Sequence, residues 1–182
     1  MRKFRLYLDK DKEEKWLNKM CQKGWAMTGF CLGVYTFAPC EPGQYIYQID
    51  MPREIGKDNM RDEKREQYVE LVEETGAEHV CDWFWWAYFR REASLGEFEL
   101  YTDLESQIAL YERIQKLFLW VGVMEFLLGI NNTTSVMERG MENLDVPLVL
   151  GLTLIYTIIL AFIVAITKTT IKIKKLKRQI VS

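Results

Sequence analysis

The sequence has few of the residues, and none of the motifs, that commonly carry catalysis. It contains one histidine in 182 residues, and it has no G-x-S-x-G, Walker loop or Gly-rich dinucleotide turn. Its cysteines form no C-x-x-C pair and no zinc-type spacing, which predicts reduced, structural thiols and no metal site. The four cysteines are Cys21, Cys31, Cys40 and Cys81. We therefore expect neither enzymatic activity nor a cofactor.

The N-terminal part of the chain also lacks an excess of positive charge. Residues 1–116 carry 17 Lys and Arg against 22 Asp and Glu, a net charge of −5, whereas residues 117–182 carry 7 against 4, a net charge of +3. A protein that binds a phosphate backbone needs clustered Lys and Arg to displace counterions. We therefore expect no direct nucleic-acid binding by residues 1–116. The first residues lack the apolar core of a signal peptide, so none is predicted.

The C-terminal third, by contrast, contains long apolar runs. Residues 146–167 form an uncharged stretch of 22 residues, which would span about 33 Å as a helix. A buried core helix is the alternative, but the length of the run and the lysines that follow it favour a membrane span. Residues 117–137 are long enough for another span, with an external loop over residues 138–145. The sequence thus predicts a two-helix transmembrane hairpin.

Basic residues flank both outer ends of this predicted hairpin. Arg113 and Lys116 precede it, and a basic tail over residues 168–182 follows it. By the positive-inside rule, we expect a cell-membrane protein with two spans and with both termini in the cytoplasm. A stop-transfer flank is sufficient to explain the tail and is the favoured interpretation, and binding of anionic lipid headgroups is the alternative. Its cations are Lys168, Lys172, Lys174, Lys175, Lys177 and Arg178.

One ionisable residue, Glu125, interrupts the first predicted span. A charge in the middle of a bilayer is costly, so such a residue usually faces a partner or water. We expect the Glu125 carboxyl either to be protonated or to accept a hydrogen bond from the second helix. The candidate donors there are Thr153, Tyr156 and Thr157. A functional role, a helix–helix contact and a tolerated neutral carboxyl all remain open.

Residues 1–116 predict a cytoplasmic α+β domain with an internal repeat at an offset of 52 or 53 residues. A helix over residues 11–23 ends at Gly24, and a helix over residues 61–74 ends at Gly76. Strands are expected around Phe4–Leu8, Met27–Phe37, Tyr45–Asp50, Val80–Arg90 and Phe98–Asp103. This β-α-β-β-α-β order, with a further strand, is the ferredoxin-like pattern of an antiparallel sheet with two helices on one face. A third helix is expected to continue into the first span.

The most unusual stretch of this domain is the aromatic sequence of residues 83–89. In one continuous strand, alternate side chains would face opposite sides of the sheet. A sheet with helices on one face leaves its other face open, so some of the rings would form an exposed patch. We expect a ligand or partner surface here, with homodimerisation by sheet packing favoured over the stacking of a flat ligand. Its residues are Trp83, Trp85, Trp86 and Tyr88.

Several segments of the chain resemble a known family. They are FRLYLDKDKEEKWLNKMCQKGW, GVYTFAPCEPGQYIYQID, ETGAEHVCDWFWWAYFRR and GEFELYTD. Together they resemble the domain-of-unknown-function 2812 family of Gram-positive bacteria, over roughly residues 3–116. Members of that family typically lie in operons with PadR-type transcriptional regulators. The resemblance implies a membrane component that works with such a regulator, and it brings no catalytic residues.

Three functional hypotheses follow. The first is a membrane-anchored sensing or protein-interaction module, the regulatory partner of a PadR-type regulator. The second is an accessory component of membrane transport, or of resistance to membrane-active compounds, which depends on Glu125. The third is a haem-dependent or other small-molecule enzyme on a ferredoxin-like scaffold. It depends on His79, although a lone histidine at a strand edge is ordinarily structural or exposed.

Overall fold

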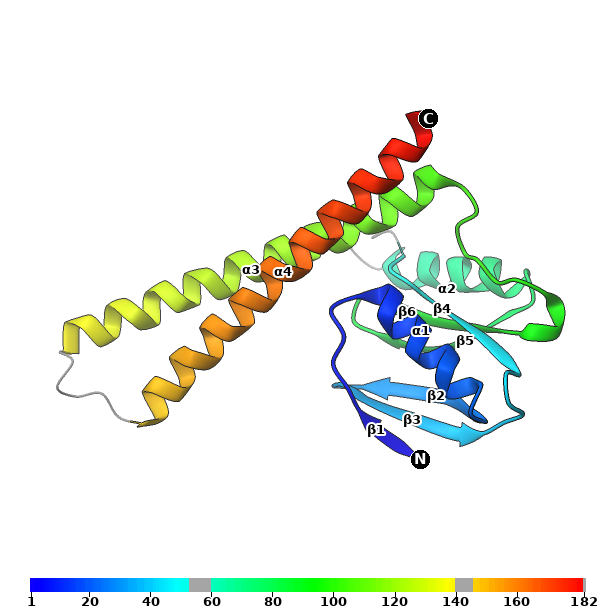
Figure 1. The fold of residues 1–182 in the computed structure, drawn as a ribbon, viewed down its shortest axis with the longest axis horizontal. Coiled ribbons are helices and arrows are strands. Elements are labelled where there is room, and N and C mark those ends of the chain that lie inside the picture. The colour runs from blue at the N-terminus through cyan, green and yellow to red at the C-terminus, as the bar shows by residue number, and fades with distance from the viewer. Residues whose placement is uncertain (53–59, 140–145, 182) are drawn as a thin grey trace. The chain divides into compact units, whose positions relative to one another are not determined.

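The computed structural model describes residues 1–52, 60–139 and 146–181. The chain divides into two compact units, Met1–Thr102 and Asp103–Ser182, which we call the N-terminal and the C-terminal unit. The N-terminal unit is α+β, and the C-terminal unit consists of two long apolar helices (Figure 1). The predicted α+β class and the two long apolar C-terminal helices are therefore confirmed. The predicted boundary after residue 116 falls inside the first of these helices.

The N-terminal unit contains two segments with the same order of elements. The first comprises β1 (Arg2–Phe4), α1 (Lys10–Cys21), β2 (Trp25–Cys31) and β3 (Val34–Pro39). The second comprises β4 (Tyr45–Asp50), α2 (Met60–Glu73), β5 (Ala77–Trp83) and β6 (Trp86–Glu92), followed by the short 3₁₀ helix η1 (Ala93–Leu95). The strands form two antiparallel sheets, in the orders β1-β3-β2 and β4-β6-β5.

The predicted strands around Met27–Phe37 and Val80–Arg90 are each a hairpin, and this corrects the expected topology. The chain reverses at Leu32 and Gly33, whose φ angles are 48° and 78°, and again at Phe84, whose φ is 50°. Such positive φ angles match the tight turns that join antiparallel strands. The order is therefore β-α-β-β twice, with two three-stranded sheets in place of one. The described backbone of residues 98–103 forms no strand.

The two β-α-β-β segments share backbone details at an offset of 52 residues. The first strand of each hairpin, β2 or β5, has a shift in register after its third residue. Each helix is followed by a glycine with positive φ, and each hairpin turn begins with a non-glycine residue of positive φ. The corresponding pairs are Met27 and His79 at the shift, Gly24 and Gly76 after the helix, and Leu32 and Phe84 at the turn.

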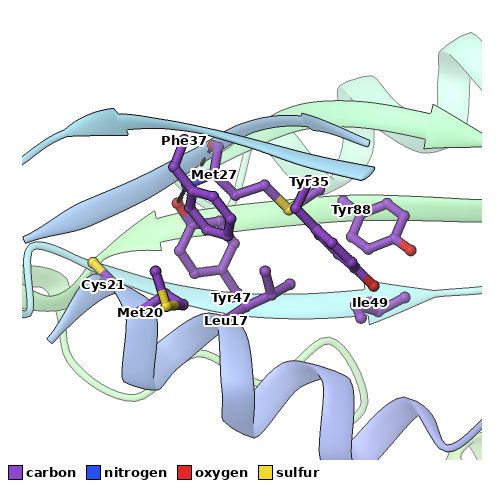
Figure 2. Close-up of a cluster of buried hydrophobic side chains, with 9 residues drawn as sticks. All are labelled: Leu17, Met20, Cys21, Met27, Tyr35, Phe37, Tyr47, Ile49 and Tyr88. Atoms are coloured by element: carbon purple, nitrogen blue, oxygen red, sulfur yellow. Dashed lines mark hydrogen bonds between the residues drawn. The ribbon is translucent and has the colours of Figure 1, made fainter. Parts of the chain in front are cut away.

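One core of buried side chains joins α1 to strands of both sheets (Figure 2). The helix contributes a stripe at helical spacing, in which every third or fourth residue faces the strands. The strands contribute mainly aromatic side chains. The members are Leu17, Met20, Cys21, Met27, Tyr35, Phe37, Tyr47, Ile49 and Tyr88. Because both sheets supply residues, the N-terminal unit is one packed body with two sheets.

The C-terminal unit is a pair of helices, α3 (Leu104–Arg139) and α4 (Val146–Val181), of 36 residues each. They pack against each other in antiparallel order, because Gly122 of α3 lies against Phe162 while Gly129 lies against Ile155. Both helices are long and apolar enough to cross a membrane. Many of their large apolar side chains are exposed. These features support association with a membrane.

Candidate interaction surface and polar sites

Exposed apolar side chains gather at the turns of the two hairpins. Leu32 and Phe84, the first residues of the turns, are 72% and 71% exposed. Phe30 of β2 meets Trp83 of β5 edge-on, with ring centroids 5.6 Å apart. Since Phe30 and Trp83 each lie within two residues of a turn, both turns lie at the same end of the N-terminal unit.

The chain before α1 extends this apolar cluster. A Cβ atom added to Gly33 would lie 2.9 Å from Phe4 Cε2 and 2.8 Å from Leu6 Cδ2, so these two exposed side chains contact the β2–β3 turn. At the other turn, the ring of Phe84 stacks on that of Trp85, with centroids 5.7 Å apart. We call this cluster the hairpin-tip patch. It comprises Phe4, Leu6, Leu32, Phe84 and Trp85.

The residues predicted to form an aromatic surface lie in different places. Trp85 lies in the β5–β6 turn and is half-buried. Trp83 and Trp86, the residues on either side of that turn, are half-buried and pack against the core. Tyr88 is 2% exposed and belongs to the core itself. The predicted surface required one continuous strand, but β5 and β6 form a hairpin, which changes which side chains share a face.

A buried acidic residue accounts for the position of Tyr88. Glu13 of α1 accepts hydrogen bonds at Oε1 from the hydroxyls of Tyr35, at 2.6 Å, and Tyr88, at 2.8 Å. Burial raises the pKa of the Glu13 carboxyl, and the two phenol hydrogen bonds oppose this shift. Sequence reasoning missed Glu13 because acidic residues usually face water at the start of a helix. Its spacing of four residues from Leu17 was the available signal.

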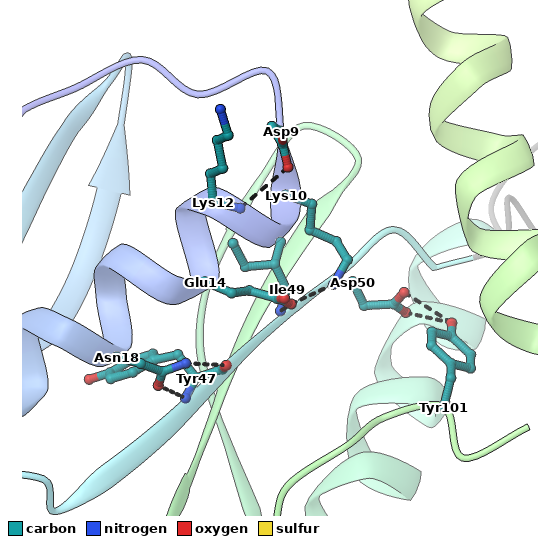
Figure 3. Close-up of polar contacts among 9 residues, drawn as sticks. All are labelled: Asp9, Lys10, Lys12, Glu14, Asn18, Tyr47, Ile49, Asp50 and Tyr101. Atoms are coloured by element: carbon teal, nitrogen blue, oxygen red, sulfur yellow. Dashed lines mark hydrogen bonds and ion pairs between the residues drawn. The ribbon is translucent and has the colours of Figure 1, made fainter. Parts of the chain in front are cut away.

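The next residue, Glu14, ties α1 to the edge of a sheet (Figure 3). Its carboxylate pairs with Lys10 Nζ at 2.5 Å and accepts the Ile49 N–H at 2.7 Å. Burial raises the Glu14 pKa, and Lys10 opposes that shift. One turn later, Asn18 accepts the Tyr47 N–H at 2.7 Å and donates to the Tyr47 carbonyl at 3.3 Å. Side chains of α1 thus satisfy backbone groups of edge strand β4.

A third carboxylate, Asp50 at the end of β4, is fully buried. It accepts hydrogen bonds from the hydroxyl of Tyr68 at 2.5 Å and from that of Tyr101 at 2.9 and 3.0 Å. Tyr68 belongs to α2, and Tyr101 to the segment predicted as a further strand (Figure 3). A buried carboxylate requires hydrogen-bond partners. The partners of Asp50 come from α2 and from the segment after η1, so Asp50 connects these two parts of the N-terminal unit to β4.

The lone histidine forms a surface ion-pair cluster. His79 Nε2 lies 2.9 Å from Asp82 Oδ1, and Arg65 Nη2 lies 2.6 Å from the same oxygen. Burial raises the Asp82 pKa, but hydrogen bonds from His79 and Arg65 outweigh it and lower the value to about 2. Within residues 1–52, 60–139 and 146–181, no three or more His, Cys, Asp or Glu side chains are grouped to hold a metal ion.

Glu125 lies on the face of α3 that packs against α4. Gly122 and Gly129, one turn before and after it, contact Phe162 and Ile155. The expected hydroxyl partners are bonded elsewhere. Tyr156 pairs with Thr133 at 2.8 Å, Thr157 donates to the Thr153 carbonyl, and Thr153 donates to the Val149 carbonyl. In the part of the chain that the structure describes, no side chain hydrogen-bonds to the Glu125 carboxyl.

The predicted basic tail is the last part of α4 and packs against the start of α3. Ile173 and Leu176 are buried there with Ile108. Lys177 Nζ pairs with Glu112 Oε1 at 2.8 Å, and Lys172 Nζ lies 5.2 Å from the centre of the Tyr111 ring. The remaining cations project from exposed positions of the helix. They are Lys168, Lys174, Lys175 and Arg178.

The geometry defines a packed α+β unit with an exposed apolar patch, joined to two helices of membrane length. The family model described as "Protein of unknown function (DUF2812)" matches residues 9–123. The chain therefore belongs to the DUF2812 family. No curated protein and no solved structure matches it.

Proposed function

We propose that this protein is a membrane-anchored interaction module. In this proposal α3 and α4 cross the cell membrane, and the N-terminal unit and the end of α4 lie in the cytoplasm. The exposed cations at the end of α4 support that orientation, since cytoplasmic flanks are enriched in Lys and Arg. The hairpin-tip patch carries the proposal, because exposed apolar groups of this kind mark interaction sites.

The proposed partner is a transcriptional regulator of the PadR type. The N-terminal unit, residues 1–102, is mildly acidic, with 15 Lys and Arg against 19 Asp and Glu, a net charge of −4. Three of these carboxylates, Glu13, Glu14 and Asp50, are buried. The surface of the unit therefore carries no excess of positive charge and would not repel the basic surface of a DNA-binding protein. The hairpin-tip patch would supply the apolar contact, and the helix pair would hold the regulator at the membrane.

We also propose that the N-terminal unit is a duplication of one β-α-β-β segment. The equal sheet orders and the backbone details at an offset of 52 residues support it. The two halves differ at the tips, where the second turn carries Phe84 and Trp85 and the first carries Leu32 and Gly33. Each half thus supplies apolar residues to the same patch.

The test is a pull-down of the tagged full-length protein from its native host, with the hairpin-tip patch changed. The double variant Leu32→Asn and Phe84→Asn removes two exposed apolar side chains. Asn tolerates positive φ, so the turns should keep their shape. The matched control is Leu71→Asn, which removes a 62% exposed leucine from α2.

We expect the wild type and the Leu71 variant to recover a PadR-type regulator, and the double variant to recover at least about tenfold less, equivalent to about 1.4 kcal/mol. Equal recovery by all three proteins would contradict a role for the patch. Recovery of a transporter in place of a regulator would favour the transport hypothesis and direct attention to Glu125. Recovery of this chain alone would count against the regulator as partner and likewise direct attention to Glu125 and the helix pair.

A further inference from the structure

Two of the cysteines lie next to each other at the C-terminal end of α1. Cys21 is the last residue of α1, Cys40 directly follows β3, and their Sγ atoms are 3.9 Å apart. Cys21 is buried in the core (Figure 2), and Cys40 is half-buried. We propose that Cys21 and Cys40 form a thiol–disulfide site, which a peroxide oxidises to an intrachain disulfide.

Backbone hydrogen bonds hold the two cysteine segments together. The Cys21 carbonyl accepts from the N–H groups of Gly24, at 2.8 Å, and Gly43, at 2.9 Å, and the Cys40 N–H donates to the Gly24 carbonyl at 3.0 Å. A Cβ atom on Gly24 would lie 3.2 Å from the Cys40 carbonyl oxygen. Backbone hydrogen bonds thus already hold the two segments together. Rotation of the two side chains can therefore bring the Sγ atoms most of the way from 3.9 Å to the disulfide bond length of about 2.05 Å.

The exposures of the two thiols set the order of the reaction. Cys40 is the more accessible, so its thiolate attacks the O–O bond of the peroxide. This forms a sulfenic acid and releases water after protonation. The Cys21 sulfur then attacks the Cys40 sulfur and displaces the hydroxyl, which leaves as water with the Cys21 proton. In sum, two thiols and one hydrogen peroxide give one disulfide and two waters, and the two electrons lost by sulfur reduce the peroxide.

The surroundings of the two sulfurs affect the two steps differently. The Tyr45 N–H donates to Cys21 Sγ at 3.2 Å, and this hydrogen bond helps to hold that sulfur beside Cys40. Burial, together with the hydrogen bond to Cys21, raises the pKa of the Cys40 thiol to about 11. The first step is therefore slow at neutral pH, and its rate should rise about tenfold per pH unit below the pKa, in step with the thiolate.

The other two thiols provide an internal comparison. Cys31 is exposed beside the β2–β3 turn, and Cys81 is half-buried on β5. Neither has a cysteine sulfur within hydrogen-bonding distance in the part of the chain that the structure describes. A peroxide should therefore give them unpaired oxidation products, whereas the Cys21 and Cys40 thiols should disappear together.

The test uses the full-length protein in nanodiscs of phosphatidylethanolamine and phosphatidylglycerol. The protein is treated with hydrogen peroxide, quenched, denatured, alkylated with N-ethylmaleimide and mapped by peptide mass. We expect a disulfide-linked Cys21–Cys40 peptide pair that a reductant separates, formed about tenfold faster at pH 9 than at pH 8. A Cys21 thiol that stays alkylatable after Cys40 has been oxidised would overturn the proposal, as would disulfides between chains.

Two single variants separate the steps. In Cys21→Ser, Cys40 should stop at the sulfenic acid and react with dimedone. In Cys40→Ser, Cys21 should remain a free thiol. Rapid oxidation of Cys21 in the Cys40→Ser variant would contradict the proposed order of attack. The mapping of the wild-type protein needs no substitution, so the disulfide itself is tested even if a variant fails to fold.

Discussion

At the scale of single residues, three buried carboxylates determine how the helices of the N-terminal unit pack. Glu13, Glu14 and Asp50 each have hydrogen-bond donors inside the protein: phenols, a backbone amide and a lysine. A buried carboxylate without partners is strongly unfavourable. These residues therefore favour one packing arrangement over other arrangements of the same apolar side chains.

The raised pKa of Glu13 predicts a pH-dependent stability. Folding raises this pKa above the unfolded value of 4.5, so the folded state binds the proton more tightly. The stabilising contribution is present below pH 4.5 and is lost as the pH rises through the folded pKa. Relative to Glu13→Gln, the wild type should lose up to about 1.4 kcal/mol per pH unit in that window.

The measurement is the free energy of urea unfolding from pH 4.5 upward, followed by tryptophan fluorescence of the full-length protein in detergent. Glu70→Gln, which changes an exposed carboxyl on α2, is the matched control. A constant difference between the wild type and Glu13→Gln across the window would mean that Glu13 has the same pKa folded and unfolded.

At the scale of elements, the two hairpins are the features that sequence reasoning missed. The helices were predictable, because α1 shows a clear apolar stripe and residues 146–167 are an unbroken apolar run. The turns lack the Asn-Gly or Asp-Gly signal that identifies a two-residue hairpin, and Phe84 and Trp85 look like strand residues. The partners of Glu13 were not predictable either, since Tyr88 is 75 residues away in the chain.

The β2–β3 turn yields a prediction about glycine. In Gly33→Ala, the alanine would have to adopt a φ of 78°. Its Cβ would lie within 3 Å of side-chain atoms of Phe4 and Leu6. Gly43 has a φ of 77°, but a Cβ added there would have no atom within 4 Å, so Gly43→Ala incurs backbone strain alone. The exposed ends of the Phe4 and Leu6 side chains can turn away, whereas the Arg5 carbonyl oxygen, 3.1 Å from the new Cβ, belongs to the backbone. We therefore expect a cost of about 1–2 kcal/mol for Gly43→Ala and up to about 1 kcal/mol more for Gly33→Ala.

The same urea-unfolding experiment compares the two glycine variants. Equal free energies for both would show that Phe4 and Leu6 move away at no cost. In that case the Phe4 and Leu6 side chains would not be fixed against the β2–β3 turn, although β1 stays paired with β3, and the hairpin-tip patch would be limited to Leu32, Phe84 and Trp85.

At the scale of the whole molecule, the chain combines two units with different surfaces. The N-terminal unit buries a mixed core, whereas α3 and α4 leave side chains such as Trp120 and Leu150 exposed. Such apolar helices are stable where lipid replaces water. Hydropathy predicted the apolar parts of both helices, residues 117–137 and 146–167, but it did not predict that α4 continues through the basic residues to Val181. The position of Glu125 relative to α4 was not predictable, because it depends on how the glycines of α3 pack against isoleucine and phenylalanine side chains of α4.

The most direct test of the membrane-anchored account labels Cys31 in cells of the native host. Cys31 is exposed in the N-terminal unit, so a membrane-impermeant maleimide reports on which side of the membrane it lies. Cys31→Ser is the control for labelling at the other cysteines. If α3 and α4 cross the membrane and the N-terminal unit lies in the cytoplasm, the protein should sediment with membranes and Cys31 should be labelled only after the membrane is permeabilised. Labelling of Cys31 in intact cells, or recovery of the protein in the soluble fraction, would contradict it.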